Sequence, residues 1–232
     1  MKNYQSKNFV NNEWLSNGSG DCLTVLDKYT GEEIGKIPHA TEDQMEQAIV
    51  GANEAFEITK KWSAGKRADM MKALYAKLEE HKERFIDIII NEGGKPRSYA
   101  TNEIDRCLTT LRLAYEEATR FGGEIVPMDF DAGAGKTALT KRFPIGVIAC
   151  ITPFNFPLNL VMHKVAPALA VGCTVVIKPA PQAPMSCLAF AELMQEVGYP
   201  AGVINVLVCD IPVAEKLVRD ERVAKLSFTG SD

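Results

Sequence analysis

Several features are scarce in this chain of 232 residues, and each scarcity excludes a class of protein. Only three histidines occur, none close to another, and no two of the six cysteines form a C-x-x-C pair, so we expect no metal site. No stretch approaches the roughly 20 continuous apolar residues of a membrane helix, and residues 1–10 lack the apolar run of a signal peptide. We therefore expect a cytoplasmic protein with reduced thiols and no membrane partner.

Neither sign of charge dominates the sequence. Lysine and arginine total 26, aspartate and glutamate total 30, and the formal net charge is −4 without any basic block. Nucleic acid is therefore not expected as a partner. Hydrophobic residues make up 46% of the chain, which is enough to build the core of one large or two small globular domains.

The two common glycine-rich signatures of nucleotide-binding proteins are missing. The pattern G-x-G-x-x-G does not occur. Gly135-Lys136-Thr137 resembles the end of a phosphate-binding P-loop, but Phe130 stands where that motif requires its first glycine. No buried strand is predicted before this segment either. Any nucleotide must therefore be held by other means.

Short strands are predicted near the start of the chain. Phe9–Val10 and Trp14 flank the turn residues Asn11–Asn12. Tyr29–Gly31 separates a second pair of extended segments, so a hairpin is predicted there.

Helices are predicted over most of residues 41–120. The spacing of Thr41 and Gln44 predicts a capping box at the start of the first helix. Apolar residues at helical spacing predict two longer helices over about 66–91 and 99–120. Glycine follows each of these two helices and ends it.

Residues 124–142 differ in character from their neighbours. Ile125–Pro127 and Thr137–Arg142 have the pattern of extended segments, and small residues join them. Two interpretations stay open, a protruding hairpin and a linker.

From residue 143 onward, predicted strands alternate with predicted helices. The strands fall at 145–151, 173–177, 203–208 and 223–228, and the helices at 158–171, 184–197 and 212–218. This alternation predicts an α/β fold with right-handed βαβ units and a doubly wound parallel sheet. Ligands of such sheets bind beyond the carboxyl ends of the strands, so those ends are where we expect a site.

The segment Thr152–Pro157 follows the first of these strands and contains one group suited to catalysis. Pro153 and Pro157 fix their own φ angles, and Asn155 between them carries a neutral amide donor. An amide directed into a cleft can stabilise a developing oxyanion. The alternative is an asparagine that only caps the helix predicted from residue 158.

Two other strand ends carry polar groups. Lys178 follows a buried strand, and its ammonium group could donate to ribose hydroxyls or to a phosphate; the alternative is a solvated surface lysine. The last strand ends in Thr229-Gly230-Ser231, a turn suited to hold a pyrophosphate at the start of a helix. The alternative for this turn is an ordinary helix cap.

Taken together, these segments resemble the aldehyde dehydrogenase superfamily, whose members depend on NAD or NADP. In the first part of the chain, Thr30–Glu32 and Gly94–Pro96 fit the family pattern. The matching segments of the second part are 143–147, 152–157, 167–172, 175–179, 202–206 and 227–231, in family order. The resemblance covers only the amino-terminal portion of the family.

The resemblance implies roles for individual residues. Asn155 matches the asparagine that stabilises the thiohemiacetal oxyanion, and Lys178 matches the lysine that binds the adenosine ribose. The coenzyme-binding positions that it implies are Thr152, Pro153, Phe154, Lys178, Ala180, Pro181, Gly230 and Ser231. It further implies oxidation of an aldehyde to a carboxylic acid, with NAD or NADP as coenzyme.

The resemblance also implies a division of the chain. Residues 1–123 would be the N-terminal strands and helices of the coenzyme-binding domain, and residues 143–232 its Rossmann-like βαβ core. Residues 124–142 would belong to an oligomerisation hairpin, so the full-length form is expected to be a homo-oligomer, either a dimer or a tetramer. The catalytic domain is not represented in the sequence.

Three departures from the family pattern matter. Pro181 stands where many members have a glutamate that bonds the ribose, which leaves the choice between NAD and NADP open. Cys209 replaces a common glycine of the adenine pocket. No residue matches the catalytic cysteine or the glutamate base, so the isolated chain is expected to be inactive. A non-catalytic coenzyme-binding fragment or a truncated pseudoenzyme is the alternative function.

The substrate can be narrowed only to a class. The segments His163–Pro167 and Lys178–Gln182 resemble members that act on small polar aldehydes such as lactaldehyde or glyceraldehyde 3-phosphate. Arg106, on the helix predicted over about 99–120, could attract an anionic substrate. The alternative is a solvated helix arginine.

Overall fold

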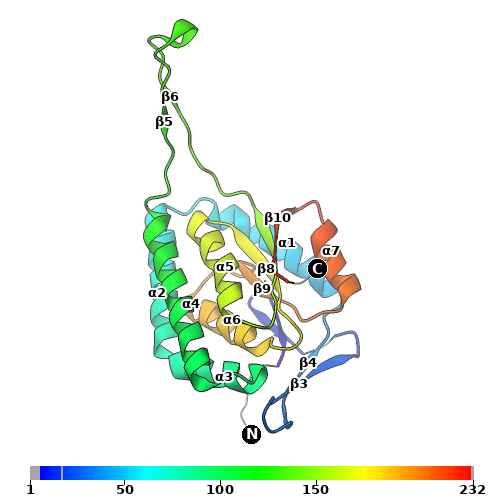
Figure 1. Ribbon diagram of the computed structural model, residues 1–232. Coiled ribbons are helices and arrows are strands. Elements are labelled where there is room, and N and C mark those ends of the chain that lie inside the picture. Colours follow the sequence, from blue (N-terminus) through cyan, green and yellow to red (C-terminus); the bar gives the residue numbers. More distant parts are fainter. Residues whose placement is uncertain (1–5, 17, 231–232) are drawn as a thin grey trace.

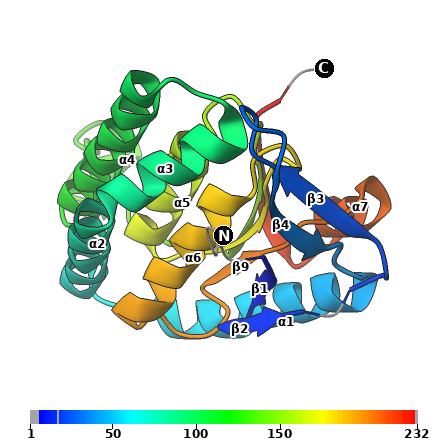
Figure 2. The ribbon, with the colours of Figure 1, turned by 90° about the horizontal axis from the view of Figure 1, so that it is seen from below.

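A six-stranded sheet forms the centre of the computed structural model, which describes residues 6–16 and 18–230. The strand order is β10-β7-β8-β9-β1-β2, and helices cover both faces of the sheet (Figures 1 and 2). Four strands run parallel: β7 (Val147–Ile151), β8 (Thr174–Lys178), β9 (Ile204–Val206) and β10 (Val223–Phe228). The predicted α/β class and parallel doubly wound sheet are therefore confirmed.

The sheet separates two hydrophobic cores, because successive strand residues point to opposite faces. In β7, Ile148 and Cys150 face the larger core, whereas Val147 and Ala149 face the smaller one. Since both of its faces are covered, β7 is apolar throughout, as expected for a buried parallel strand, whereas β10 beside it contains Lys225 and Ser227 and is largely exposed.

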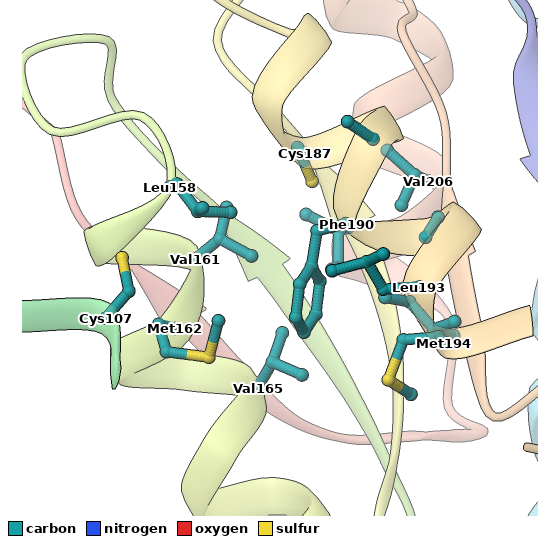
Figure 3. Close-up of a cluster of buried hydrophobic side chains, with 14 of the residues drawn as sticks. Cys107, Leu158, Val161, Met162, Val165, Cys187, Phe190, Leu193, Met194 and Val206 are labelled. Atoms are coloured by element: carbon teal, nitrogen blue, oxygen red, sulfur yellow. The ribbon is translucent and has the colours of Figure 1, made fainter. Parts of the chain in front are cut away.

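Two sets of helices build these cores. The larger core contains α5 (Asn159–Val171) and α6 (Met185–Val197), against which α2 (Ala64–Glu80), α3 (Lys82–Gly93) and α4 (Arg97–Ala118) pack. The smaller core contains α1 (Glu42–Thr59) and α7 (Ile211–Arg219). Figure 3 shows the ring of Phe190 in α6 directed toward Val161 and Val165 of α5. Among the described helices, none is both long and apolar enough to cross a bilayer.

The N-terminal strands join the same sheet. β1 (Asn8–Val10) and β2 (Glu13–Leu15) form a hairpin whose turn residues Asn11 and Asn12 have φ angles of 52° and 62°. This is the left-handed region that asparagine tolerates, and two such residues suit a tight hairpin turn. β1 also pairs antiparallel with β9 through Phe9 and Val206. β3 (Cys22–Leu26) and β4 (Glu33–Pro38) form a separate two-stranded sheet, as predicted.

The prediction of one helix over 66–91 is wrong, because α2 and α3 are distinct helices. They meet at His81, whose φ of −96° and ψ of 15° leave the helical region. α2 buries a narrow stripe of Met71, Leu74 and Leu78, whereas α3 buries a wide face that includes Phe85 and Ile88. No proline or glycine marks this break. The two helices bury different faces, and the chain changes direction at His81 between them.

Residues 124–142 form a hairpin rather than a linker. β5 (Ile125–Val126) pairs antiparallel with β6 (Ala138–Leu139), and a short 3₁₀ turn at Asp131–Gly133 lies at the tip. The hairpin extends away from the body of the protein (Figure 1). Its apolar residues Ile125 and Leu139 are exposed.

Candidate functional site

The carboxyl ends of three parallel strands meet at one edge of the sheet. Ile151 at the end of β7 is in register with Lys178 of β8 on one side and with Phe228 of β10 on the other. The backbone N–H of Thr152 donates to the carbonyl of Lys178 at 3.3 Å, and that of Thr229 donates to Ile151 at 3.1 Å. The strand order runs from β7 to β9 in one direction and places β10 on the opposite side. This edge is therefore the topological switch point, where doubly wound sheets bind their ligands.

The predicted coenzyme residues fall at this edge, where the structure brings together Thr152, Pro153, Phe154, Lys178, Ala180, Pro181 and Gly230. Thr152 is buried, and its hydroxyl Oγ1 has no hydrogen-bond partner in the described part of the chain. Phe154 and Pro181 are exposed, whereas Ala180 is buried. Ser231 lies outside the described residues.

Lys178 lies beside Cys209, which follows β9. Burial raises the pKa of the Cys209 thiol to about 11, and the positive charge of Lys178 opposes this rise. The ammonium group of Lys178 forms no ion pair with any carboxylate of the described residues. A half-buried cation without an internal partner is thus available at this strand end.

Asn155 is exposed on the loop between β7 and α5. Its Oδ1 accepts a hydrogen bond from the backbone N–H of Phe156 at 3.1 Å. Its side-chain NH₂ has no acceptor within residues 6–16 and 18–230, so the donor end of the amide is available to a ligand. The alternative that Asn155 caps the following helix is wrong, because α5 begins at Asn159 with Leu158 as its N-cap.

The cap of α5 comes instead from Glu103, which no local sequence pattern predicted. Glu103 of α4 is fully buried, and its Oε1 accepts hydrogen bonds from the backbone N–H groups of Leu158 at 3.0 Å and Asn159 at 3.1 Å. Its Oε2 lies 2.5 Å from the ammonium nitrogen of Lys95. The only sequence signal for this role was an acidic residue on the apolar face of a helix, next to the buried Ile104.

A second buried glutamate caps α6 in the same way. Glu92 of α3 accepts hydrogen bonds from the backbone N–H groups of Met185 at 2.6 Å and Ser186 at 3.0 Å. Burial raises the pKa of Glu92 to about 7, although the hydrogen bonds that it accepts oppose this rise. α5 and α6, the helices after the loops that end β7 and β8, are therefore both held by carboxylates from the outer helix layer.

Arg106 lies close to the Asn155 loop. It is exposed, and its guanidinium carbon is 5.2 Å from the centre of the Phe156 ring. No carboxylate among the described residues forms an ion pair with it. Partial burial lowers the pKa of His163, and the positive charges of Arg106 and Lys164 lower it further. Arg106 thus places a positive charge beside Phe156, whereas His163 is held toward its neutral form.

A cavity of about 650 Å³ is lined by residues of α5, β10 and the segment 141–145. Neither Asn155 nor Lys178 lines it. The ionisable groups around it, apart from the Cys173 thiol, are basic: Lys60, Arg67, Lys141, Arg142, His163, Lys164 and Lys225. The buried Lys164 donates to Thr229 Oγ1 at 2.7 Å and Ser227 Oγ at 3.2 Å, and so ties α5 to the end of β10.

The buried cysteine thiols have raised pKa values and are therefore expected to be unreactive. Burial raises the pKa of Cys150 to about 12, and it raises those of Cys107 and Cys187 well above the ordinary value. A thiol of this kind stays protonated at neutral pH and is a poor nucleophile. Cys107, Cys150 and Cys187 are therefore poor candidates for a nucleophile.

Comparison with known proteins gives close relatives over nearly the whole chain. A model of the aldehyde dehydrogenase family matches residues 14–232. The 3-sulfolactaldehyde dehydrogenase of Priestia aryabhattai is 39% identical over 225 residues, which are 96% of this chain and 46% of that protein. The NADP-dependent succinate-semialdehyde dehydrogenase of Escherichia coli K12 is 36% identical over 98% of this chain and 47% of its own length.

A solved structure gives the same result. The NADP-dependent glyceraldehyde-3-phosphate dehydrogenase of Bacillus halodurans, complexed with NADP, matches with a TM-score of 0.91 and 34% identity, over 97% of this chain and 48% of that chain. The chain therefore spans about half the length of the relatives it matches. Because the family model covers all but the first 13 residues, the chain belongs to the aldehyde dehydrogenase family.

Proposed function

We propose that this chain supplies the coenzyme-binding part of an enzyme that oxidises an aldehyde to a carboxylic acid with NAD or NADP. One observation carries the proposal. At the switch point of the sheet, three polar groups without a described partner occur together: the amide donor of Asn155, the hydroxyl of Thr152 and the ammonium of Lys178. Buried or half-buried polar groups without partners are rare, so the Thr152 hydroxyl and the Lys178 ammonium support a ligand here, and the exposed Asn155 amide is free to reach one.

These groups fit a nicotinamide dinucleotide. Lys178 would donate to the ribose hydroxyls, and Thr152 Oγ1 would bond a polar atom of the coenzyme. When bound, the coenzyme would take up the hydride that leaves the aldehyde carbon.

In this proposal Asn155 acts on the substrate. Its NH₂ would donate to the oxygen of the aldehyde carbonyl as that oxygen becomes an oxyanion. The local bond from Phe156 N–H to Oδ1 supports this role, because it fixes which end of the amide faces outward. The nucleophile would have to come from outside these 232 residues, so the isolated chain is proposed to have no turnover.

We further propose an aldehyde that carries an anionic group. Arg106 supplies a guanidinium beside Phe156, the residue after Asn155, and no carboxylate of the described residues forms an ion pair with it. Three of the relatives support this substrate class, because 3-sulfolactaldehyde, succinate semialdehyde and glyceraldehyde 3-phosphate each bear an acidic group. A glyceraldehyde-3-phosphate-type substrate fits this pattern, whereas lactaldehyde itself carries no anionic group.

The assembly proposed for the full-length enzyme is a homo-oligomer in the cytoplasm. The protruding hairpin supports it, since Ile125 is 81% and Leu139 is 71% exposed. Apolar residues on such a projecting element are suited to contact a second copy.

Replacing Lys178 by methionine is expected to weaken coenzyme binding about 10- to 100-fold, because a hydrogen bond from a charged group is worth about 1.5–3 kcal/mol. Isothermal titration calorimetry of the purified chain with NAD and with NADP measures this change. Lys136→Met on the hairpin is the matched control and should bind like wild type. An absence of binding heat with either coenzyme would contradict the proposed function.

Replacing Pro181 by glutamate is expected to shift the coenzyme preference toward NAD. A carboxylate placed three residues after Lys178 would repel a 2′-phosphate and could accept a bond from a ribose hydroxyl. We expect the ratio of the dissociation constants for NADP and NAD to rise about tenfold. Pro181→Gln is the neutral control. An unchanged ratio in Pro181→Glu would mean that residue 181 does not face the ribose.

A further inference from the structure

Lys95 and Glu103 form an ion pair directly beneath the loop that carries Asn155. Glu103 is fully buried, and a single carboxylate oxygen accepts both the Leu158 and Asn159 amides. The first amides of a helix have no partner within the helix, so an external carboxylate satisfies them. The carboxylate therefore fixes where α5 begins relative to α4.

Lys95 reaches the same loop by a different contact. Its ammonium nitrogen lies 4.0 Å from the centre of the Phe156 ring, within the range of a cation–π interaction. Phe156 directly follows Asn155, and its N–H donates to Asn155 Oδ1. The ion pair therefore contacts residues 156, 158 and 159, whereas the other end of the loop is held by the bond from Thr152 N–H to Lys178.

We infer that the Lys95–Glu103 pair is a positioning device that sets the direction of the Asn155 amide. This inference rests on the proposed oxyanion role of Asn155. It gives a function to the Gly94-Lys95-Pro96 segment: Gly94 ends α3 with a left-handed φ of 68°, and Pro96 precedes α4, so Lys95 is held in the short connection between these helices.

Because the Glu103 carboxylate is buried, the local structure depends on the positive charge of Lys95. Removing the charge of Lys95 leaves Glu103 buried without a compensating cation, a situation that strongly destabilises the local structure. It also frees the Phe156 ring from its ammonium contact. Asn155 would then sample several directions, although α5 itself remains packed in the larger core.

The test compares three lysine variants of the chain. Lys95→Met removes the charge and Lys95→Arg keeps it. Lys82→Met is the matched control, because Lys82 pairs with Asp105 of α4, the helix that carries Glu103, and has no recorded contact with the loop. Two-dimensional ¹H–¹⁵N NMR reports the side-chain NH₂ of Asn155, and hydrogen exchange reports the Leu158 and Asn159 amides. Urea unfolding gives the global stability of each variant.

Lys95→Met is expected to broaden or shift the Asn155 side-chain signals and to accelerate exchange at Leu158 and Asn159 at least about tenfold beyond the change in global stability. Lys95→Arg should restore both readouts, and Lys82→Met should leave them unchanged. Phe156→Leu, which keeps the ion pair, should alter the Asn155 signals while the two amides stay protected.

Unchanged Asn155 signals in Lys95→Met would overturn the inference, as would an equal change in Lys82→Met. If Lys95→Met fails to fold, an unchanged Asn155 signal in Phe156→Leu would overturn it. These readouts need no coenzyme. A chain that binds neither NAD nor NADP in calorimetry would contradict the proposed function separately.

Discussion

In a form of the enzyme as long as its relatives, Asn155→Ala is expected to lower kcat about 100- to 1,000-fold, which corresponds to about 2.7–4 kcal/mol of lost transition-state stabilisation. The reason is the free donor: the Asn155 NH₂ has no acceptor in the described part of the protein, whereas Oδ1 is occupied by Phe156 N–H. A donor of this kind matters most when charge develops on the substrate oxygen.

Steady-state kinetics together with coenzyme binding test this role. The dissociation constant for the coenzyme should stay near the wild-type value, because Asn155 is not among the residues proposed to hold the coenzyme. Asn155→Asp keeps the shape but presents an anion to the oxyanion, so it should lower kcat at least as much as Asn155→Ala. Wild-type kcat in Asn155→Ala would remove Asn155 from the mechanism.

The second large effect is a loss of stability with rising pH that depends on Glu92. Burial raises the pKa of Glu92 to about 7 in the folded chain. In the unfolded chain the pKa is near the ordinary value of about 4.3, so the folded state binds the proton more tightly between these values. The resulting stabilisation is fully present below pH 4 and is lost as the pH rises through 7.

Between pH 5 and pH 8, the free energy of unfolding of the wild type is expected to fall by about 2–3 kcal/mol because of Glu92. The Glu92→Gln variant should lack this part of the decrease. Urea unfolding of both proteins across this range measures the difference. Glu83→Gln, on the exposed side of the same helix, is the control and should follow the wild type. Parallel pH profiles for wild type and Glu92→Gln would show that Glu92 is ionised throughout.

The parts of the fold that depend on neighbouring residues were predictable from the sequence. The Thr41–Gln44 capping box forms as predicted, with bonds of 3.0 Å and 3.2 Å, because all of its partners lie within four residues. The Asn11–Asn12 turn likewise follows from the left-handed conformations that asparagine tolerates. The alternation of strands and helices was sufficient to predict that Thr152 and Lys178 lie at the same edge of the sheet, since parallel strands end on the same side.

The supports of the site could not be predicted, because they join distant segments. Glu103 is separated by 55 residues from the Leu158 amide that it accepts, and Glu92 by 93 residues from that of Met185. The sequence shows only that each glutamate lies among apolar neighbours. The break at His81 has the same origin, since it follows from what α2 and α3 pack against and not from a local signal.

The pairing of β1 with β9 constrains when the protein can finish folding during translation. Asn11 N–H bonds to Asn205 Oδ1 at 2.9 Å across 194 residues of sequence. A ribosome adds roughly 5–20 residues per second, so the first hairpin must wait roughly 10–40 s for its partner strand to be synthesised. During this interval Phe9, which is fully buried in the finished fold, remains accessible to chaperones and proteases.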